Sequence, residues 1–203
     1  MSDEQAIHSS PAHTELAELA ISLGATEAAT IQSRAIVVKE SLAALCKDPG
    51  CFNYGLAPSC PPYVSGPAGF RQLMGVHPLA FVYKIDVHAE VLLSPAVADL
   101  MRLVQEIGTS VERAALARGH ARASAFAGGC CKNLWCGDEP DCRVVDQEGE
   151  CRYPDQARPS MSGYGVDTSA LLRSAGWTLE RVDPRTKPTP EAIGTVCGLV
   201  LLG

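Results

Sequence analysis

Cysteine spacing is the feature of this 203-residue chain that most restricts its fold and its chemistry. Eight of its nine cysteines fall into two clusters. The first has the pattern C-x4-C-x8-C, is followed directly by two prolines, and consists of Cys46, Cys51 and Cys60. The second has the pattern C-C-x4-C-x5-C-x8-C and consists of Cys130, Cys131, Cys136, Cys142 and Cys151. Eight thiols make two sets of four, and four thiolates are the usual ligands of a [4Fe-4S] cluster.

Zinc is the main alternative occupant of such a set of thiols. Structural zinc sites pair their ligands in short turns, because a tight turn aims two sulfurs at one tetrahedral ion. This chain has no C-x2-C turn, and its longer spacings form wide loops that suit a cluster of several irons. A proline beside the last cysteine, as in Cys60-Pro61, fixes the backbone and removes an N–H donor. The spacings therefore favour iron–sulfur clusters over zinc, and both over disulfides or unliganded thiols.

The distribution of ligands between two clusters depends on the neighbours Cys130 and Cys131. Four cysteines form a self-contained set, namely Cys131, Cys136, Cys142 and Cys151. The first loop supplies only three thiols, so a cubane there needs a fourth ligand or has an open iron. Neighbouring side chains of an extended backbone point to opposite faces, and Cys130 is therefore expected to complete the first set. The alternative is that one of the two is a buried bystander, as we expect of Cys197 in its apolar segment.

Composition is that of an ordinary globular protein and restricts the possible partners. With 46% hydrophobic and 20% charged residues, the chain suits one domain over residues 1–203, with a flexible tail at residues 1–9. A net charge of −6 and only 5% aromatic residues argue against a nucleic-acid partner. The same charge is compatible with a basic redox partner protein, although it is also an ordinary solubility feature.

The sequence also predicts where the protein resides. Its longest apolar run, residues 197–202, is too short to cross a bilayer. The first 14 residues lack the basic and apolar regions of a signal peptide. We therefore expect a cytoplasmic protein without a membrane partner. In such a reducing compartment, clustered cysteines bind metal more often than they form disulfides.

Hydrophobic periodicity predicts an α+β fold in which helices pack on a mixed β-sheet. The expected helices are residues 11–23, 66–74, 97–115 and 166–175, and the expected strands are 36–38, 79–88, 121–127, 177–182 and 193–202. Two cysteine-rich, cluster-binding loops, residues 46–62 and 128–160, connect these elements. Four cations surround the second loop and could offset the charge of a cluster or dock an acidic partner: Lys132, Arg143, Arg152 and Arg158. Solvated loops commonly carry such residues as well.

Several short motifs give the chain a resemblance to a known family. They are Cys60-Pro61-Pro62, Cys151-Arg152-Tyr153-Pro154, Ala157-Arg158-Pro159-Ser160-Met161 and Gly165-Val166-Asp167. Together they resemble a small prokaryotic family of predicted metal-binding proteins, and the likeness extends from about residue 36 to residue 177. The resemblance implies metal bound by cysteines, with iron–sulfur clusters, in a cytoplasmic and oxygen-poor setting.

Three functions fit these observations. The first is electron transfer by two [4Fe-4S] clusters to a redox partner protein or a substrate. The second is a redox enzyme that uses a cluster with an open iron site, and the third is a structural or interaction module whose loops are held by zinc. The sequence leaves open whether the chain is an enzyme, and it contains neither a glycine-rich phosphate loop nor a nucleophile elbow. A homodimer that packs the two cysteine loops at its interface is compatible with all three.

Overall fold

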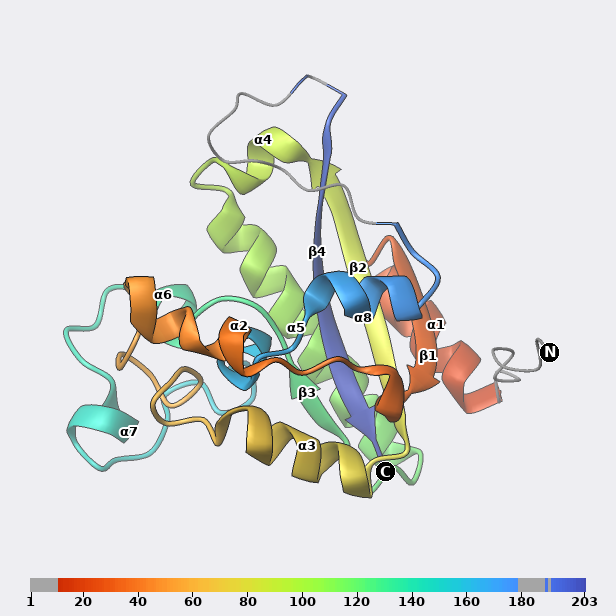
Figure 1. Ribbon diagram of the computed structural model, residues 1–203, viewed down its shortest axis with the longest axis horizontal. Helices are drawn as coiled ribbons and strands as arrows, with labels where there is room; N and C mark the ends of the chain where they lie inside the picture. Colours follow the sequence, from red (N-terminus) through yellow and green to blue (C-terminus); the bar gives the residue numbers. More distant parts are fainter. Residues whose placement is uncertain (1–10, 179–188, 190) are drawn as a thin grey trace.

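A four-stranded β-sheet forms the centre of the fold (Figure 1). The computed structural model describes residues 11–178, 189 and 191–203. The order of the strands in the sheet is β1-β2-β4-β3, with the bounds β1 (Glu27–Gln32), β2 (Leu79–His88), β3 (Ser124–Phe126) and β4 (Ile193–Leu202). All neighbouring strands are antiparallel. β2 and β4 pair along their full length and are the central strands.

One face of the sheet is covered by α1 (Pro11–Ser22) and α5 (Val97–Ala117). Phe81 and Tyr83 of β2 point toward this face, and so do Val200 and Leu202 of β4. α5 contributes an apolar stripe at helical spacing, made of Leu100, Val104, Ile107, Val111 and Ala115. These side chains form the first of two hydrophobic layers.

The other face is covered by α3 (Gly66–Val76), α8 (Thr168–Ser174) and the 3-10 helix η3 (Met161–Tyr164). The residues of β2 and β4 that alternate with the first set point here, namely Ala80, Val82, Leu199 and Leu201. Phe70 of α3 packs edge-on against Phe126 of β3, with ring centroids 5.0 Å apart. Because helices cover both faces, β2 and β4 are apolar at consecutive positions and not only at alternate ones.

The shorter elements lie outside these layers. They are the 3-10 helix η1 (Ser33–Ala35), α2 (Glu40–Ala44), the π-helical turn η2 (Cys46–Gly50), α4 (Ala89–Leu92), α6 (Cys131–Trp135) and α7 (Arg143–Asp146). α6 and α7 are parts of the second cysteine loop, and they lie at the end of the molecule away from α1 (Figure 1). Within the described part of the chain, no helix is both long and apolar enough to cross a membrane.

The predicted α+β class is confirmed, but the direction of the strands is corrected. The sequence predicted a mixed sheet, whereas all three pairs of neighbouring strands in the described residues are antiparallel. β2 and β3 do run in the same direction, but β4 lies between them and pairs antiparallel with both. A parallel bridge joins Ala127 to Ser160, outside the named strands.

Most of the predicted elements agree with the observed ones, but one predicted strand is wrong and one observed strand was not predicted. The predicted strand at residues 36–38 is wrong, because Val38 forms only an isolated bridge, to Val166. The prediction missed β1, an edge strand rich in alanine of which only Ile31 is buried. The predicted flexible tail and most of the predicted strand at 177–182 lie outside the described residues.

The Gly165-Val166-Asp167 motif fixes the start of α8. Gly165 has a φ of 72°, and a Cβ there would lie 2.3 Å from the carbonyl oxygen of Lys39. Asp167 is the N-cap, and its Oδ1 accepts a hydrogen bond of 3.0 Å from the backbone N–H of Ala170. Its Oδ2 lies 2.7 Å from Lys39 Nζ. The hydrogen bond from Lys39, followed by that from Ala170, lowers the pKa of Asp167.

Replacing this cap tests the stability of α8. Asp167→Ala is expected to lower the free energy of unfolding by about 1 kcal/mol at pH 7, measured by urea denaturation, because the cap and its ion pair are lost. The pKa of Asp167 is lower in the folded state, so its contribution is present above the unfolded-state pKa of about 3.9 and is lost as the pH falls through the folded-state value. Glu106→Ala is the control, since that exposed α5 side chain has no hydrogen bond or ion pair in the described structure. Equal losses in the two variants would contradict the capping role.

Candidate metal centre

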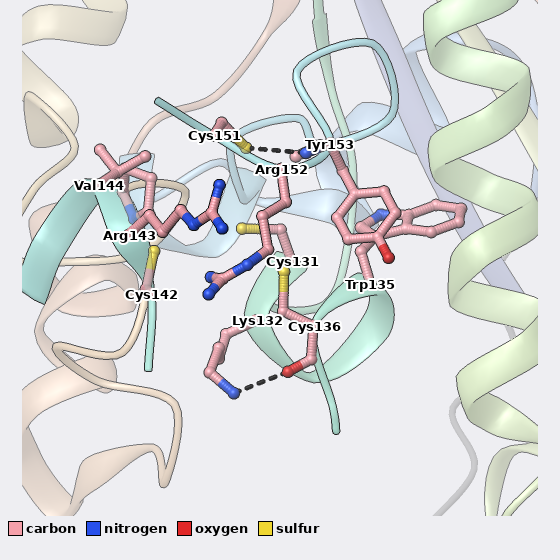
Figure 2. A pocket seen from close by; sticks show the side chains of 12 residues that line it. Cys131, Lys132, Trp135, Cys136, Cys142, Arg143, Val144, Cys151, Arg152 and Tyr153 are labelled. Carbon is pink, nitrogen blue, oxygen red and sulfur yellow. Dashed lines mark hydrogen bonds between the residues drawn. The ribbon is translucent and has the colours of Figure 1, made fainter. Parts of the chain in front are cut away.

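Four of the eight predicted ligands line one cavity (Figure 2). They are Cys131, Cys136, Cys142 and Cys151, and we call this space the thiol cavity. All four belong to the second cysteine loop and are free thiols. The rest of the wall includes apolar and aromatic side chains, among them Trp135, Val144 and Tyr153. The structure thus brings together the four cysteines that the sequence grouped as a self-contained set.

Two short helices, α6 and α7, position these cysteines around the cavity. Cys131 is the first residue of α6, and Cys136 is the residue that ends it. Cys142 precedes α7, and its backbone N–H donates a hydrogen bond of 2.7 Å to the carboxylate of Asp146. Cys151 follows α7, and its Sγ accepts a hydrogen bond of 3.4 Å from the backbone N–H of Tyr153. The loop is therefore held by its own local hydrogen bonds.

Cys130 and Cys131 are neighbours in the chain, and only Cys131 lines the thiol cavity. Cys130 has extended dihedral angles of φ −104° and ψ 123°. Its thiol interacts with that of Cys60 from the first cysteine loop, whereas the thiol of Cys131 faces the thiol cavity. The interaction between the two thiols lowers the pKa of Cys130 and raises that of Cys60.

The remaining two predicted ligands lie at the two ends of the π-helical turn: Cys46 is its first residue and Cys51 directly follows it. The backbone N–H of Cys51 donates a hydrogen bond of 2.9 Å to the carbonyl of Cys46. Burial, and then the charge of Cys51, raises the pKa of Cys46. Cys51 is exposed, in contrast to the buried Cys60 and Cys130. Cys197, predicted to be a bystander, is buried in β4 and packs in the hydrophobic layer beneath α3 and α8.

The cysteines in the described residues do not form a preformed site for a single zinc ion. A Zn–S bond of about 2.3 Å brings tetrahedral sulfurs to within about 4 Å of one another. No group of three Cys, His, Asp or Glu side chains in the described residues converges closely enough to hold one metal ion. Soft thiolates nevertheless select zinc, copper(I) or iron–sulfur clusters over hard cations. The donor set of the thiol cavity therefore suits a soft metal.

Burial favours the protonated form of two thiols of the cavity, Cys131 and Cys136. It raises the pKa of Cys131 to about 11, although a hydrogen bond from Ser59 acts in the opposite direction. Burial also raises the pKa of Cys136, against the charge of Arg152. Because only thiolates ligate metals, binding at this cavity must release protons.

Three of the four predicted cations line the thiol cavity, namely Lys132, Arg143 and Arg152. Lys132 Nζ donates to the backbone carbonyls of Cys136 and Glu139, at 2.7 and 2.6 Å. Arg152 pairs with the carboxylate of Glu139 at 3.0 Å. The guanidinium of Arg143 points among the sulfurs (Figure 2), and no hydrogen bond or ion pair of this group occurs in the described residues. Positive charge is thus available to offset thiolates.

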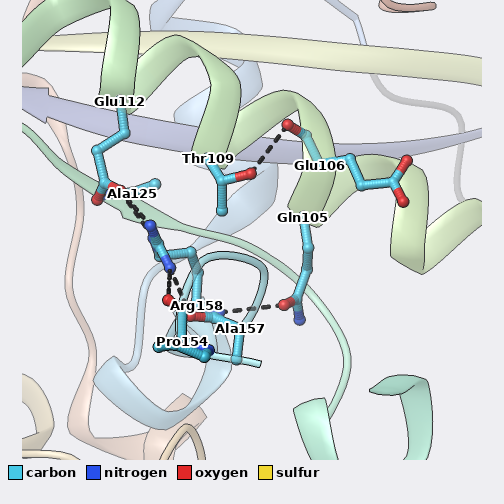
Figure 3. A network of polar contacts seen from close by, with 8 residues as sticks. All are labelled: Gln105, Glu106, Thr109, Glu112, Ala125, Pro154, Ala157 and Arg158. Atoms are coloured by element: carbon cyan, nitrogen blue, oxygen red, sulfur yellow. Dashed lines mark hydrogen bonds and ion pairs between the residues drawn. The ribbon is translucent and has the colours of Figure 1, made fainter. Parts of the chain in front are cut away.

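Arg158, the fourth cation, instead anchors the second cysteine loop to α5 (Figure 3). Its Nε donates a hydrogen bond of 2.8 Å to Oε2 of Glu112. The other carboxylate oxygen of Glu112 accepts a hydrogen bond of 2.7 Å from the backbone N–H of Ala125 in β3. The side chains of Arg158 and Glu112 are only 16% and 11% exposed, so this ion pair is largely removed from water.

Gln105, which is fully buried on α5, forms hydrogen bonds with three residues of the same loop. Its Nε2 donates to the carbonyl of Gly128 at 3.1 Å. Its Oε1 accepts hydrogen bonds from Trp135 Nε1 at 3.3 Å and from the backbone N–H of Arg158 at 3.1 Å. Sequence reasoning missed Gln105 and Glu112, although both are polar residues seven positions apart beside the apolar stripe of a helix. It also missed Ser59, whose only sequence signal is its position beside Cys60.

A cavity of four thiols, with a second buried thiol pair beside it, is characteristic of a cysteine-rich metal-binding protein. The chain belongs to the family described as "Predicted metal-binding protein (DUF2284)", which matches residues 29–202. The metal-binding part of the predicted resemblance is thereby confirmed, over a longer stretch than the motifs indicated. No curated protein and no solved structure matches the chain.

Removing the buried ion pair tests how the second cysteine loop is anchored. Arg158→Met is expected to lower the free energy of unfolding by about 3 kcal/mol, because the Glu112 carboxylate is left buried without its partner. Arg118→Met is the control. It breaks an ion pair with Glu15 whose side chains are 35% and 56% exposed, and is expected to cost less than about 1 kcal/mol. Similar values for both variants in urea denaturation would show that Arg158 is no anchor.

Proposed function

We propose that this protein holds two [4Fe-4S] clusters and transfers electrons to a redox partner protein or a substrate. The observation that carries the proposal is the thiol cavity, where four cysteines of one loop face a shared space. Neither a carboxylate nor an imidazole is among the described residues that line it. Four thiolates without oxygen or nitrogen ligands are the usual donor set of such a cluster.

The contacts of the thiols support a division of the eight cysteines into two ligand sets. We propose that one cluster binds Cys131, Cys136, Cys142 and Cys151, and that the other binds Cys46, Cys51, Cys60 and Cys130. The contact between Cys60 and Cys130 supports the second set, because it brings a thiol of the second loop to the first. With that fourth ligand, the first cluster needs no open iron. Electron transfer is therefore favoured over an enzyme with an open iron site.

The spacing of the thiols also favours clusters over a zinc-held module. A zinc site in the described residues would need three or four ligands already converging on one point, and none converges so closely. A cluster of four irons is bound at its separate corners, so its ligands can stand farther apart.

A bound [4Fe-4S] cluster supplies a one-electron redox couple whose potential depends on charge, hydrogen bonding and exposure. The chain's own residues set these conditions. Ala57, Trp135 and Ala157 pack against the buried thiols and restrict access of water. Cys51 is exposed, and the neighbouring Phe52 is 83% exposed. We propose that the redox partner approaches at this part of the first cysteine loop.

Metal analysis tests the proposed function. Protein purified without oxygen is expected to contain about eight irons and eight labile sulfides per chain. Its visible absorption is expected to bleach on addition of dithionite. Protein that contains zinc and no labile sulfide would contradict the proposal and favour the zinc-held module.

Substituting each of the two neighbouring cysteines tests the division of ligands. Cys130→Ser and Cys131→Ser are each expected to lose about half of the iron, because each removes a ligand of a different cluster. The EPR signals of the clusters that remain are expected to differ between the two variants. Cys197→Ala is the control and is expected to keep all of the iron. Identical residual spectra for the two serine variants would contradict the division.

A further inference from the structure

Ser59 is a buried residue that contacts both cysteine loops. It is 5% exposed and directly precedes Cys60 in the first loop. Its backbone carbonyl accepts a hydrogen bond of 2.9 Å from the N–H of Ser160. Its side-chain Oγ donates to Cys131 Sγ of the second loop at 3.1 Å and lies 3.8 Å from Cys60 Sγ. A fixed backbone and a short contact place this hydroxyl between the two proposed ligand sets.

The hydroxyl hydrogen of Ser59 has a sulfur as its acceptor. The backbone N–H of Cys131 lies 3.4 Å from the same Oγ, and can only donate to it. This second contact orients the oxygen lone pairs toward the backbone and the hydrogen toward Cys131 Sγ. Hydrogen bonds to charged acceptors are roughly twice as strong as neutral ones, so the bond strengthens when Cys131 is a thiolate.

We propose that Ser59 is a positioning residue that hydrogen-bonds the Cys131 thiolate and raises the reduction potential of the metal centre in the thiol cavity. This inference rests on the proposed iron–sulfur function. Reduction adds negative charge to a cluster and its thiolates, and a hydrogen bond to a ligand sulfur stabilises that charge. The effect falls mainly on the cluster of the thiol cavity, because Ser59 Oγ lies closer to Cys131 Sγ than to Cys60 Sγ.

The contact also makes one site depend on the position of the other. Ser59 moves with Cys60, its neighbour in the first cysteine loop, while its hydrogen-bond acceptor belongs to the second loop. A displacement of the first loop therefore weakens the hydrogen bond at the thiol cavity.

The test is an EPR-monitored redox titration of the anaerobic, cluster-loaded protein. Ser59→Ala is expected to make reduction of one cluster about tenfold less favourable, or about 59 mV for a one-electron couple, and to leave the other nearly unchanged. Ser59→Thr retains a hydroxyl and is expected to keep a potential near that of the wild type. Ser160→Ala is the matched control, since Ser160 is 8% exposed in the same region and has no hydrogen bond to a sulfur among the described residues.

Proton ENDOR of the reduced protein supplies a second readout that a merely structural role would not change. The wild type is expected to show one more exchangeable proton coupled to the cluster of the thiol cavity than Ser59→Ala does. If the alanine variant does not load with metal, Ser59→Gly, which also lacks the hydroxyl, gives the same comparison with the wild type. If Ser59→Ala contains both clusters and their potentials and proton couplings are unchanged, the proposed role of Ser59 is overturned. The proposed iron–sulfur function then still stands. Wild-type protein that contains no iron or sulfide overturns the proposed function, and this inference with it.

Discussion

The pairing of β2 with β4 is the constraint on which the rest of the structure depends. The two strands pair along their full length, and helices cover both faces of the sheet that they form. Side chains of both strands are therefore committed to two hydrophobic layers, including Cys197, whose pKa is raised to about 12 by burial. Ligands for a metal must come from segments beyond the sheet. The second cysteine loop begins directly after β3, the short strand at the edge, and the thiol cavity lies there.

α5 joins this core to the candidate metal centre. Its apolar stripe packs on the sheet, and the neighbouring Gln105 and Glu112 hold the second cysteine loop through Trp135 and Arg158. Both polar residues are buried, so their hydrogen bonds are costly to leave unmade. The loop is long and has little regular structure, yet its cysteines face a common space. Rigid support from a helix of the core is what allows a loop of this kind to hold ligands in a fixed arrangement.

Sequence patterns predicted the parts of this structure that follow from local periodicity. The strands at 79–88 and 193–202 and the long helix follow from uninterrupted apolar patterns, and the grouping of four cysteines follows from their spacing. β1 was missed because an edge strand of alanine and threonine carries almost no periodic signal. The position of β4 between β2 and β3 depends on long-range pairing that local patterns do not encode. The roles of Arg158 and Ser59 also depend on partners that are distant in the sequence, Glu112 and Cys131.

We propose that the eight cysteines of the two loops hold two iron–sulfur clusters, with the neighbours Cys130 and Cys131 divided between them. The buried peptide unit between Cys130 and Cys131 would then connect the two clusters. The hydrogen bond from Ser59 to Cys131 would be a second connection. The most direct measurement is anomalous X-ray diffraction, at the iron absorption edge, from crystals of protein purified without oxygen. We predict two separate iron peaks, one among Cys131, Cys136, Cys142 and Cys151 and one beside Cys60 and Cys130. A single peak, or anomalous signal at the zinc edge alone, would contradict the claim.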